Sequence, residues 1–423
     1  MTTPAPAAVF SRDRLTVLLY VALGTFGFLQ TVPGAVTPAL RAEFGYSYTT
    51  AGLHLTSYAV GSVLAGVLGP GLDRRLGRRR LLLLGLCGGA AGATGLVLGS
   101  ALPWTLLGAL VLGALGTLVL LTVQTGLSDA HGDQRPVAFA ESNVVASVGA
   151  TSGPLVVGAG AGLLGSWRWG VLGLVVATLV VASLVRHAPL PVALVEEHDV
   201  RGGRLPLSAC AGIALVFCAV VLEWCVAYWA PTYLRDVVEL ERSTAVAGGA
   251  LFFGAMLVGR TAGGVLARRY DPARIVAAAL AVFAVGLLVQ AVGTAPATSL
   301  VGLAVLGLGV SVLFPMGLSL AVAGAPSRAA LISGRCVTAG AVAVLLGPLA
   351  VGRLADAVGL RPALLVLPVT LLAAAAALAV VQATAPTGRR GHAEVGGRAQ
   401  RQAGLTPGRR SCVGSWVAGK DGR

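Results

Sequence analysis

The sequence predicts an all-α polytopic membrane protein with twelve transmembrane helices, arranged as two six-helix repeats around a central cavity. Its composition indicates the membrane class, because 56% of the residues are hydrophobic and only 11% are charged, whereas soluble domains carry roughly a quarter charged residues. Twelve long apolar runs give the number of helices, and an internal sequence repeat gives the division into two halves. The lipid bilayer is therefore the expected solvent for most of the chain.

Each apolar run is long enough to cross a bilayer as a helix, which takes about 20 residues. The runs must be helical, because lipid offers the backbone no hydrogen-bond partner and the alternating pattern of barrel strands is absent. They cover residues 15–38, 47–71, 81–101, 104–127, 137–160, 167–186, 206–233, 244–266, 273–293, 298–323, 329–352 and 361–383. The third and ninth runs are short and rich in glycine, so the count depends most on them.

The distribution of arginine predicts which loops face the cytoplasm. Thirteen arginines lie in loops after even-numbered runs and six in loops after odd-numbered runs. By the positive-inside rule, this bias places both termini on the cytoplasmic side of the cell membrane. Four tryptophans agree, because they lie at the predicted outer ends of runs, where an aromatic belt is expected. They are Trp104, Trp167, Trp169 and Trp229.

The net charge of +14 does not indicate a nucleic-acid partner. Residues 385–423 carry seven Arg and one Lys against one Glu and one Asp, a net charge of +6, and this Gly-rich tail is expected to be disordered. The remaining arginines follow membrane topology. We expect an N-terminal half at 1–186, a cytoplasmic linker at 187–205, a C-terminal half at 206–384, and then the basic tail.

The two halves coincide when the first is moved along the sequence by 194 residues. GPGLDRRL at 69–76 then falls on GGVLARRY at 263–270, and GPLVVG at 153–158 falls on GPLAVG at 347–352. Two six-span repeats related by an axis along the membrane normal are an architecture of secondary transporters, which bind substrate between the halves.

Twelve spans in two halves, with GPGLDRRLGRRR after the second span, resemble the major facilitator superfamily. That family's pattern at this place is Gly-x-x-x-Asp-Arg-x-Gly-Arg-Arg. The matching residues are Gly69, Asp73, Arg74, Gly77 and Arg78. Because Gly77 follows Asp73 by four residues rather than three, Arg78, Arg79 and Arg80 all remain candidates for the family's second arginine position. The resemblance implies that spans 1, 4, 7 and 10 line the cavity.

The resemblance and the repeat together predict ion pairs between the halves. In the family, the motif aspartate faces the cytoplasmic end of span 11, where this chain has Arg335, and span 5 packs on span 8. Glu141 in span 5 is the repeat counterpart of Arg335, and span 8 carries Arg260. We therefore predict that Asp73 pairs with Arg335 and Glu141 with Arg260 when the cytoplasmic side is shut, because charges inside a membrane are costly without partners.

Two alternatives to these cytoplasmic contacts stay open. Arg260 and Arg335 can instead extend to the lipid headgroups. Asp129, at the end of span 4, occupies a position that partners a motif arginine in the family, although a solvated loop acid is a nearly equal alternative.

Span 5 contains Gly149, Gly153 and Pro154 in the stretch GATSGPLVVG. Small residues four apart let helices approach closely, and a proline inside a helix bends it. The stretch resembles the family's antiporter motif, Gly-x-x-x-Gly-Pro-x-x-Gly-Gly, without the paired final glycines. Because span 11 has its own GPLAVG, hinge packing in both halves is the alternative. Span 4 lacks the arginine that many proton-coupled drug exporters of the family carry.

Glu223 lies near the middle of span 7, where an unpaired carboxylate costs roughly 2.5 kcal/mol or more. No basic residue is expected at the same depth. Because burial favours the neutral form of a carboxyl, we predict that Glu223 couples transport to protons or acts as counter-ion for a cationic substrate. A protonated glutamate that bonds to a neighbouring helix is the structural alternative. The predicted cavity residues are Gln30, Tyr58, Gln124, Trp224, Tyr228 and Phe314. For Gln30, Tyr58, Gln124 and Phe314, a contact between helices or a place in the core is an equal alternative.

The leading predicted function is a monomeric, proton-coupled exporter of a small organic molecule that needs neither a cofactor nor a metal. An importer or symporter of a small metabolite or anion is the first alternative. A polytopic membrane enzyme is a remote one, because the chain has no CxxC, HExxH or GxSxG motif and only one mid-depth ionisable residue. The absence of a GxxxxGK[ST] loop disfavours an ATP-driven pump.

Overall fold

The computed structural model describes residues 10–188, 190, 205–293 and 295–384. Most of the expected cytoplasmic linker and all of the basic tail lie outside these residues. Within them, twelve helical segments are long and apolar enough to cross a membrane, which confirms the predicted number. The third and ninth spans, on which the count depended most, are both present.

The first six spans comprise seven helices, because span 1 is divided at Gln30 and Thr31. They are α1 (Arg14–Leu29) with α2 (Val32–Phe44), α3 (Tyr48–Leu76), α4 (Arg78–Leu98), α5 (Leu102–His131), α6 (Arg135–Leu163) and α7 (Trp167–Val185). A short 3-10 turn, η1 (Gly132–Gln134), joins α5 to α6.

In the last six spans, the eighth, tenth and twelfth are each made of two helices. The helices are α8 (Leu207–Asp236), α9 (Arg242–Gly248) with α10 (Ala250–Leu266), α11 (Pro272–Val292), α12 (Pro296–Val310) with α13 (Leu313–Ala323), α14 (Ala329–Val358), and α15 (Leu360–Ala363) with α16 (Val366–Thr384). A second 3-10 turn, η2 (Pro326–Arg328), precedes α14.

Side-chain caps and glycines define several helix ends. Asp13 and Ser47 accept hydrogen bonds from the backbone N–H groups of Thr16 and Thr50, at 2.8 and 3.1 Å, which satisfies donors that the first helical turn leaves free. The turn between α3 and α4 has Gly77 at φ +76°, a backbone conformation that residues with a Cβ rarely adopt. The glycine spacing of the sequence motif is therefore tied to a sharp turn.

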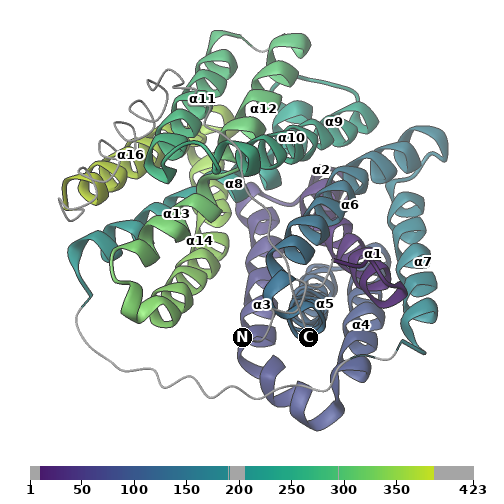
Figure 1. Ribbon diagram of the computed structural model, residues 1–423. Helices are drawn as coiled ribbons and strands as arrows, with labels where there is room; N and C mark the ends of the chain where they lie inside the picture. The colour runs from purple at the N-terminus through teal and green to yellow at the C-terminus, as the bar shows by residue number, and fades with distance from the viewer. Residues whose placement is uncertain (1–9, 189, 191–204, 294, 385–423) are drawn as a thin grey trace, which may run out of the picture. The chain divides into compact units, whose positions relative to one another are not determined.

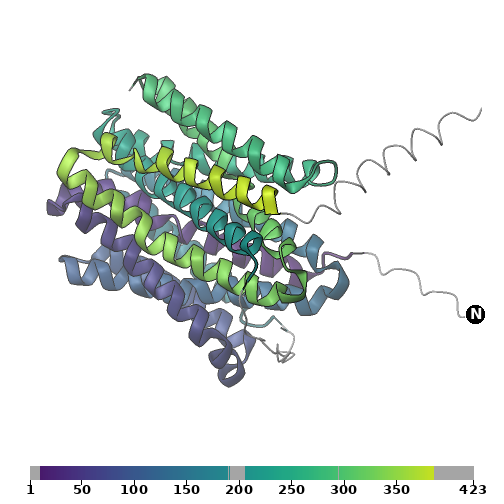
Figure 2. The same cartoon turned by 90° about the vertical axis from the view of Figure 1, so that its left-hand side faces the viewer.

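The two halves meet mainly along two pairs of spans. Helix α3 packs against α14, and α6 packs against α9 and α10. The α3–α14 contact can be followed in Figures 1 and 2. These are the contacts of span 2 with span 11 and of span 5 with span 8 that the family resemblance implies. Helix α8 lies between them, in contact with both α2 and α14.

The close helix contacts repeat with the same offset as the sequence. A Cβ on Gly113 of α5 would lie 1.9 Å from the carbonyl oxygen of Tyr58, and one on Gly307 of α12 would lie 2.3 Å from that of Phe252. Both members of the second contact lie 194 residues after those of the first. The same holds for two further contacts, Gly92 with Leu112 and Gly286 with Leu306. The repeat therefore preserves the way in which neighbouring helices pack.

The predicted tryptophan belt is wrong at two of its four positions. Trp104 and Trp169 are 62% and 57% exposed, as a belt requires, but Trp167 and Trp229 are buried. The indole N–H of Trp229 donates to the carbonyl oxygen of Pro348 at 3.1 Å, so this residue joins α8 to α14 rather than facing lipid. Position along a helix does not determine the side of the helix on which Trp229 lies.

The glycine contacts generate a stability prediction. Gly113→Ala and Gly307→Ala should each destabilise the protein by about 1–3 kcal/mol, because the added methyl group meets a neighbouring backbone carbonyl that has little room to shift. Thermal unfolding of the purified protein measures the effect. Gly66→Ala is the control, since a Cβ there meets nothing within 4 Å. An unfolding temperature for Gly113→Ala equal to that of the control would contradict the close approach of α3 and α5.

Candidate functional site

A cavity of about 240 Å³ lies between the first six and the last six spans. Helices α1, α2, α3, α5 and α6 form one side of its wall, and α8 and α10 form the other. Its polar lining consists of Gln30, Thr31, Gln124, Asn143, Ser147, Glu223, Tyr228 and Arg260. Phe26, Trp224, Phe253 and Met256 are among its apolar residues. The wall thus combines opposite charges, amides and aromatic rings from both halves.

A larger hollow of about 640 Å³ lies among α8, α11, α12, α15 and α16, entirely within the last six spans. Leucines dominate its wall, and two of them, Leu288 and Leu365, are 65% and 63% exposed on the outside of the bundle. In a membrane this apolar crevice faces lipid. The smaller cavity is the candidate functional site, because it contains the charged groups and is lined by both halves.

Most of the residues predicted for the cavity do line it. Gln30, Gln124, Trp224 and Tyr228 are in its wall together with Glu223. The side-chain amides of Gln30 and Gln124 form no hydrogen bond with any other described residue, so their donors and acceptors are available to a solute. The Tyr228 hydroxyl is not available in this way, because it donates to the backbone carbonyl of Ala51 on α3 and accepts from Thr37.

Two predicted cavity residues lie outside the wall. Tyr58 is buried behind it, with its ring centre 6.3 Å from that of Trp224. Phe314, at the start of α13, packs against the buried core near Gly340 of α14. Both lie on spans expected to lie at or near the cavity, but neither side chain is part of its wall. The angle of a helix about its own axis decides this, and the span pattern alone does not provide that angle.

The expectation that Glu223 has no basic partner is wrong. The guanidinium of Arg260 on α10 lies 3.4 Å from the carboxylate of Glu223, measured from Nη2 to Oε1. Its Nη1 donates to the hydroxyl of Ser147 on α6 at 3.2 Å. The arginine was placed near the cytoplasmic end of its span from its position in the sequence. Its long side chain carries the charge well away from the backbone position and into the cavity.

Sequence reasoning did not select Asn143, Ser147, Phe253 or Met256 for this wall. They lie on α6 and α10, which are spans 5 and 8, whereas the family resemblance directs attention to spans 1, 4, 7 and 10. A usable signal was present in span 5. Polar residues at 143, 147 and 151 recur every fourth position, which places them on one side of a helix.

The end of the bundle that carries the loops after odd-numbered spans is closed by contacts between the halves. Arg41 of α2 forms an ion pair with Asp236 of α8, and the Tyr48 hydroxyl donates to the same carboxylate at 3.0 Å. The Arg41 guanidinium also lies 3.5 Å from the centre of the Tyr48 ring. Asp356 of α14 accepts from the backbone N–H groups of Tyr48 and Thr49 at 2.7 and 2.9 Å. Carboxylates from the second half thus hold the start of α3.

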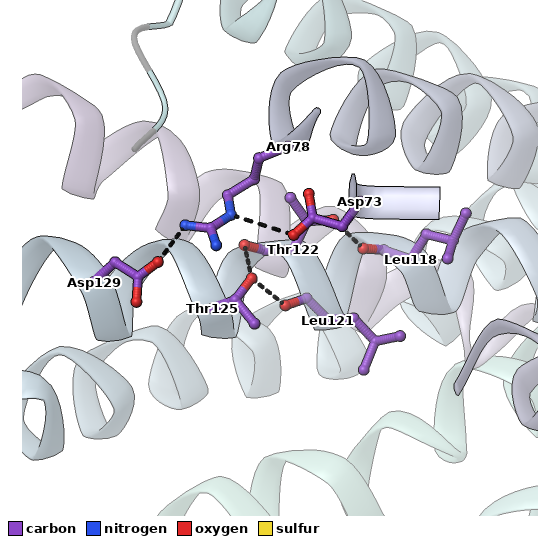
Figure 3. A network of polar contacts seen from close by, with 7 residues as sticks. All are labelled: Asp73, Arg78, Leu118, Leu121, Thr122, Thr125 and Asp129. Carbon is purple, nitrogen blue, oxygen red and sulfur yellow. Dashed lines mark hydrogen bonds and ion pairs between the residues drawn. The ribbon is translucent and has the colours of Figure 1, made fainter. Parts of the chain in front are cut away.

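The motif after span 2 forms a compact charged cluster within the first half (Figure 3). Arg78 is only 6% exposed and lies between two acids. Its Nη1 is 2.7 Å from Asp129 of α5, and its Nε is 3.8 Å from Asp73 of α3. Arg74, Arg79 and Arg80 are exposed. In this conformation Arg78 is therefore the motif arginine that pairs with Asp129.

Gly69 of the motif packs closely on the neighbouring helix. A Cβ at this position would lie 3.0 Å from a methyl group of Leu121 on α5. Because Gly77 makes the turn and Gly69 permits the approach of α3 to α5, the motif glycines place Asp73 beside the arginine.

The two predicted ion pairs between the halves are not formed in this conformation. Glu141 instead pairs with Arg12, which precedes α1, through contacts of 2.6 and 2.9 Å. Asp73 pairs with Arg78, Arg260 with Glu223, and the Arg335 side chain is exposed. The repeat could not reveal Arg12 as a partner, because this residue precedes the first span.

The segment around Arg12 is held at the end of the first half by several polar contacts. The Thr16 hydroxyl lies 2.9 Å from the ring of His131 at the end of α5. Hydrogen bonds from Thr16 lower the pKa of the Asp13 carboxyl, and the hydrogen bond to Glu141 raises the pKa of the Arg12 guanidinium. The beginning of α1 therefore contacts both α5 and α6.

The span-5 glycines pack against span 1. A Cβ on Gly149 would lie 2.1 Å from the carbonyl oxygen of Gly24 on α1, and one on Gly153 would lie 2.2 Å from the hydroxyl of Thr31. Pro154 follows inside α6 and is buried. These residues thus set the separation of two helices that line the cavity.

The sequence matches the family described as Major Facilitator Superfamily over residues 19–348 and 212–417. No individually curated protein matches the chain. Among solved structures, a bacterial homolog of the human lysosomal transporter Spinster, in an inward-facing and occupied conformation, aligns with a TM-score of 0.74 and 17% identity. The alignment covers 89% of this chain and 98% of that one.

Two further solved structures share the fold. The nucleoside transporter NupG aligns with a TM-score of 0.65 and 14% identity, over 87% of this chain and 99% of its own. A D-xylose-proton symporter aligns with a TM-score of 0.68 and 13% identity, over 88% and 97%. At these identities the likeness concerns the fold.

The charged motif generates a prediction that separates its arginines. Arg78→Ala should destabilise the protein by about 1–3 kcal/mol, because Asp73 and Asp129 lose the partner that they share in a largely buried place. Thermal unfolding measures the loss. Arg79→Ala, at the exposed neighbouring position, should have little effect. A larger loss in Arg79→Ala than in Arg78→Ala would assign the motif role to Arg79.

The closed end of the bundle generates a second prediction. Asp236→Asn removes the charge that holds Arg41, and it should shift the population toward conformations in which α2 and α14 are farther apart at this end. Spin labels at the exposed positions Ala42 and Arg353, in a cysteine-free background, report the distance by double electron–electron resonance. Glu239→Gln, an exposed acid nearby, is the matched control. Identical distance distributions in the two variants would contradict a gating role for Asp236.

Proposed function

The chain belongs to the Major Facilitator Superfamily, and from that premise we propose that it is a secondary active transporter that couples the movement of a small organic solute to protons at Glu223. One observation carries this proposal. The carboxylate of Glu223 and the guanidinium of Arg260 face each other, 3.4 Å apart, in a cavity that both halves line. A group that can gain and lose a proton thus lies where a solute would bind.

We propose that this conformation is open to the cytoplasm. The contacts of Arg41, Tyr48 and Asp356 close the end that the arginine distribution assigns to the outside. At the other end, Arg78 and Glu141 are paired within the first half. Alternating access would open the first set of contacts and bring the cytoplasmic ends together. One chain lines the whole cavity, which supports a monomer. The twelve apolar spans and the distribution of arginine support a place in the cell membrane with both termini in the cytoplasm.

The paired carboxylate provides a physical route to proton coupling. A buried carboxylate remains charged when a cation compensates it, and it favours the neutral form when that cation is removed. A solute or a helix movement that draws Arg260 away from Glu223 would therefore favour proton uptake. Rejoining the pair would favour proton release.

Two modes of coupling have specific support. Export by antiport is supported by the span-5 stretch with Gly149, Gly153 and Pro154, although these residues also have a packing role against α1. Symport of an anion is favoured by Arg260, which brings a positive charge into the cavity. Everted vesicles distinguish the modes, since only an antiporter releases protons from the vesicles when solute is added outside.

Glu223→Gln tests the coupling role. The variant should fold and insert, because Gln has the same shape and can accept and donate hydrogen bonds. It should lose proton-driven accumulation of solute while it retains downhill exchange. Transport into proteoliposomes, for a panel of solutes with and without an imposed proton gradient, measures both activities.

Glu239→Gln is the control, because it removes an exposed acid outside the cavity wall. If Glu223→Gln accumulates solute against its gradient at the wild-type rate, Glu223 has no part in coupling. The same result would support the structural role in which this side chain only forms a hydrogen bond.

A further inference from the structure

The charged pair in the cavity is asymmetric in its chemistry. Glu223 can be neutralised by a proton, whereas the guanidinium of Arg260 keeps its charge under all physiological conditions. A solute that replaces one member of the pair leaves the other without a partner. Only Glu223 can relieve that situation by taking up a proton from water.

This asymmetry selects the charge of the solute. An anion that binds Arg260 leaves Glu223 free, and a proton then neutralises the carboxylate. A cation that binds Glu223 leaves a permanent positive charge unpaired in the cavity, where no second acid is available. Within the described residues, Glu223 and Arg260 are the only charged side chains in the wall. The geometry therefore favours an anion and disfavours the cationic solute considered from the sequence.

The guanidinium retains capacity for a second acceptor. Arginine has five N–H donors in a planar fork, and here Arg260 directs one contact to Ser147 at 3.2 Å and one to Glu223 at 3.4 Å. The contact with Glu223 is long in comparison with typical charge-assisted pairs, which lie about 2.7–2.9 Å apart. Pairs of arginine with a carboxylate are also often bidentate, whereas this contact is single. A solute carboxylate can bind this fork with better geometry than Glu223 does.

The rest of the wall limits the body of the solute. The cavity, at about 240 Å³, is smaller than the roughly 300–1,000 Å³ of pockets that hold drug-sized ligands. Phe26, Trp224 and Phe253 provide flat apolar surfaces, and Gln30 and Gln124 provide free amides. A small carboxylate with a short aromatic or aliphatic body fits this combination of groups.

We infer that the cavity binds a small organic anion through a carboxylate group held by Arg260, together with one proton taken up by Glu223. The inference rests on the proposed function and defines its substrate class. In the binding step, the ion pair between Glu223 and Arg260 opens, a proton from water adds to the Glu223 carboxylate, and the solute carboxylate replaces it on the guanidinium. The loaded cavity therefore has the same net charge as the empty one.

The groups that surround this exchange are few. Helices α1, α2, α3, α5 and α6 contribute no charged side chain to the wall. The Tyr228 hydroxyl on α8 is bonded to Ala51 and Thr37. Arg335 lies on α14, which also packs against α8, but no ion pair links this arginine to Glu223 within the described residues. The proton uptake is therefore assigned to Glu223.

Direct binding to the full-length protein in lipid nanodiscs tests the inference without any gradient. The probes are benzoate, benzamide and benzylamine, which share one ring and differ in charge. Benzoate should bind about tenfold more tightly than either of the others, because it alone forms a charge-assisted pair with Arg260. Calorimetry in buffers of different ionisation enthalpy should show uptake of about one proton per benzoate, and affinity should rise from neutral to mildly acidic pH.

Three variants separate the roles of the two residues. Glu223→Gln imitates the protonated acid, so it should bind benzoate without proton uptake and without the pH dependence. Arg260→Gln should lose the preference for benzoate over benzamide. Arg268→Gln removes an exposed arginine beyond the end of α10 and should behave like the wild type, which controls for a general loss of positive charge.

Several results would overturn the inference. They are equal or tighter binding of benzylamine or benzamide, no binding of benzoate, or an unchanged pH dependence in Glu223→Gln. Its failure is distinguishable from failure of the proposed function. Proton-driven accumulation of a neutral solute in proteoliposomes would contradict the inference that the substrate is an anion, but it would agree with proton-coupled transport. Benzoate binding with proton uptake, but without gradient-driven accumulation, would support the anionic substrate and contradict proton-coupled transport.

Discussion

Close approach of helices at glycine positions is the constraint on which the rest of this structure depends. Helices in lipid gain little from burying apolar side chains against each other, so small residues that allow backbone contact determine which helices can pack. Gly113 sets α5 on α3, Gly307 sets α12 on α10, and Gly149 sets α6 on α1. Most of these helices surround the cavity. The glycine contacts therefore determine where the polar side chains of the cavity lie.

Charge pairing is the second constraint, and it acts on the sites that glycine packing creates. An intramembrane charge without a partner is costly in free energy. Removing one partner of an existing pair is destabilising for the same reason, because it leaves the other charge unpaired. Glu223 accordingly has Arg260, and Arg78 has both Asp73 and Asp129. The difference between the two sites is access to the cavity. Arg78 is nearly buried between helices of one half, while Glu223 and Arg260 share a wall with free amides.

Much of the fold could be predicted because the features that determine it, the length and spacing of apolar runs, can be read along the sequence. Apolar length gave the twelve spans, and the 194-residue offset gave their pairing into repeats. The places of Glu223, Gln30 and Gln124 in the cavity wall followed from span number. The errors concern directions across the helix axis. Phe314 packs against the buried core rather than lining the cavity, and Trp229 joins α8 to α14 rather than facing lipid.

Long side chains were the other source of error. The Cα position of Arg260 in the sequence suggested a cytoplasmic contact with Glu141, yet its guanidinium reaches Glu223. Arg12 lies outside every apolar run and therefore had no predicted structural context, although it pairs with Glu141. Because an arginine charge lies several bonds from the backbone, its partner depends on the neighbouring helices rather than on its place in the span.

Two charged clusters lie at the end of the bundle that carries the loops after even-numbered spans, and they differ in how readily they can exchange partners. The side chain of Arg78 is only 4% exposed and is shared by two acids, so withdrawing it would leave two carboxylates unpaired in a largely buried place. The Arg12 side chain is 63% exposed, and surface ion pairs contribute little to stability. We therefore infer that the Arg78 cluster moves as a rigid part of the first half. Glu141 is the acid that can release its present partner and contact the second half when this end closes.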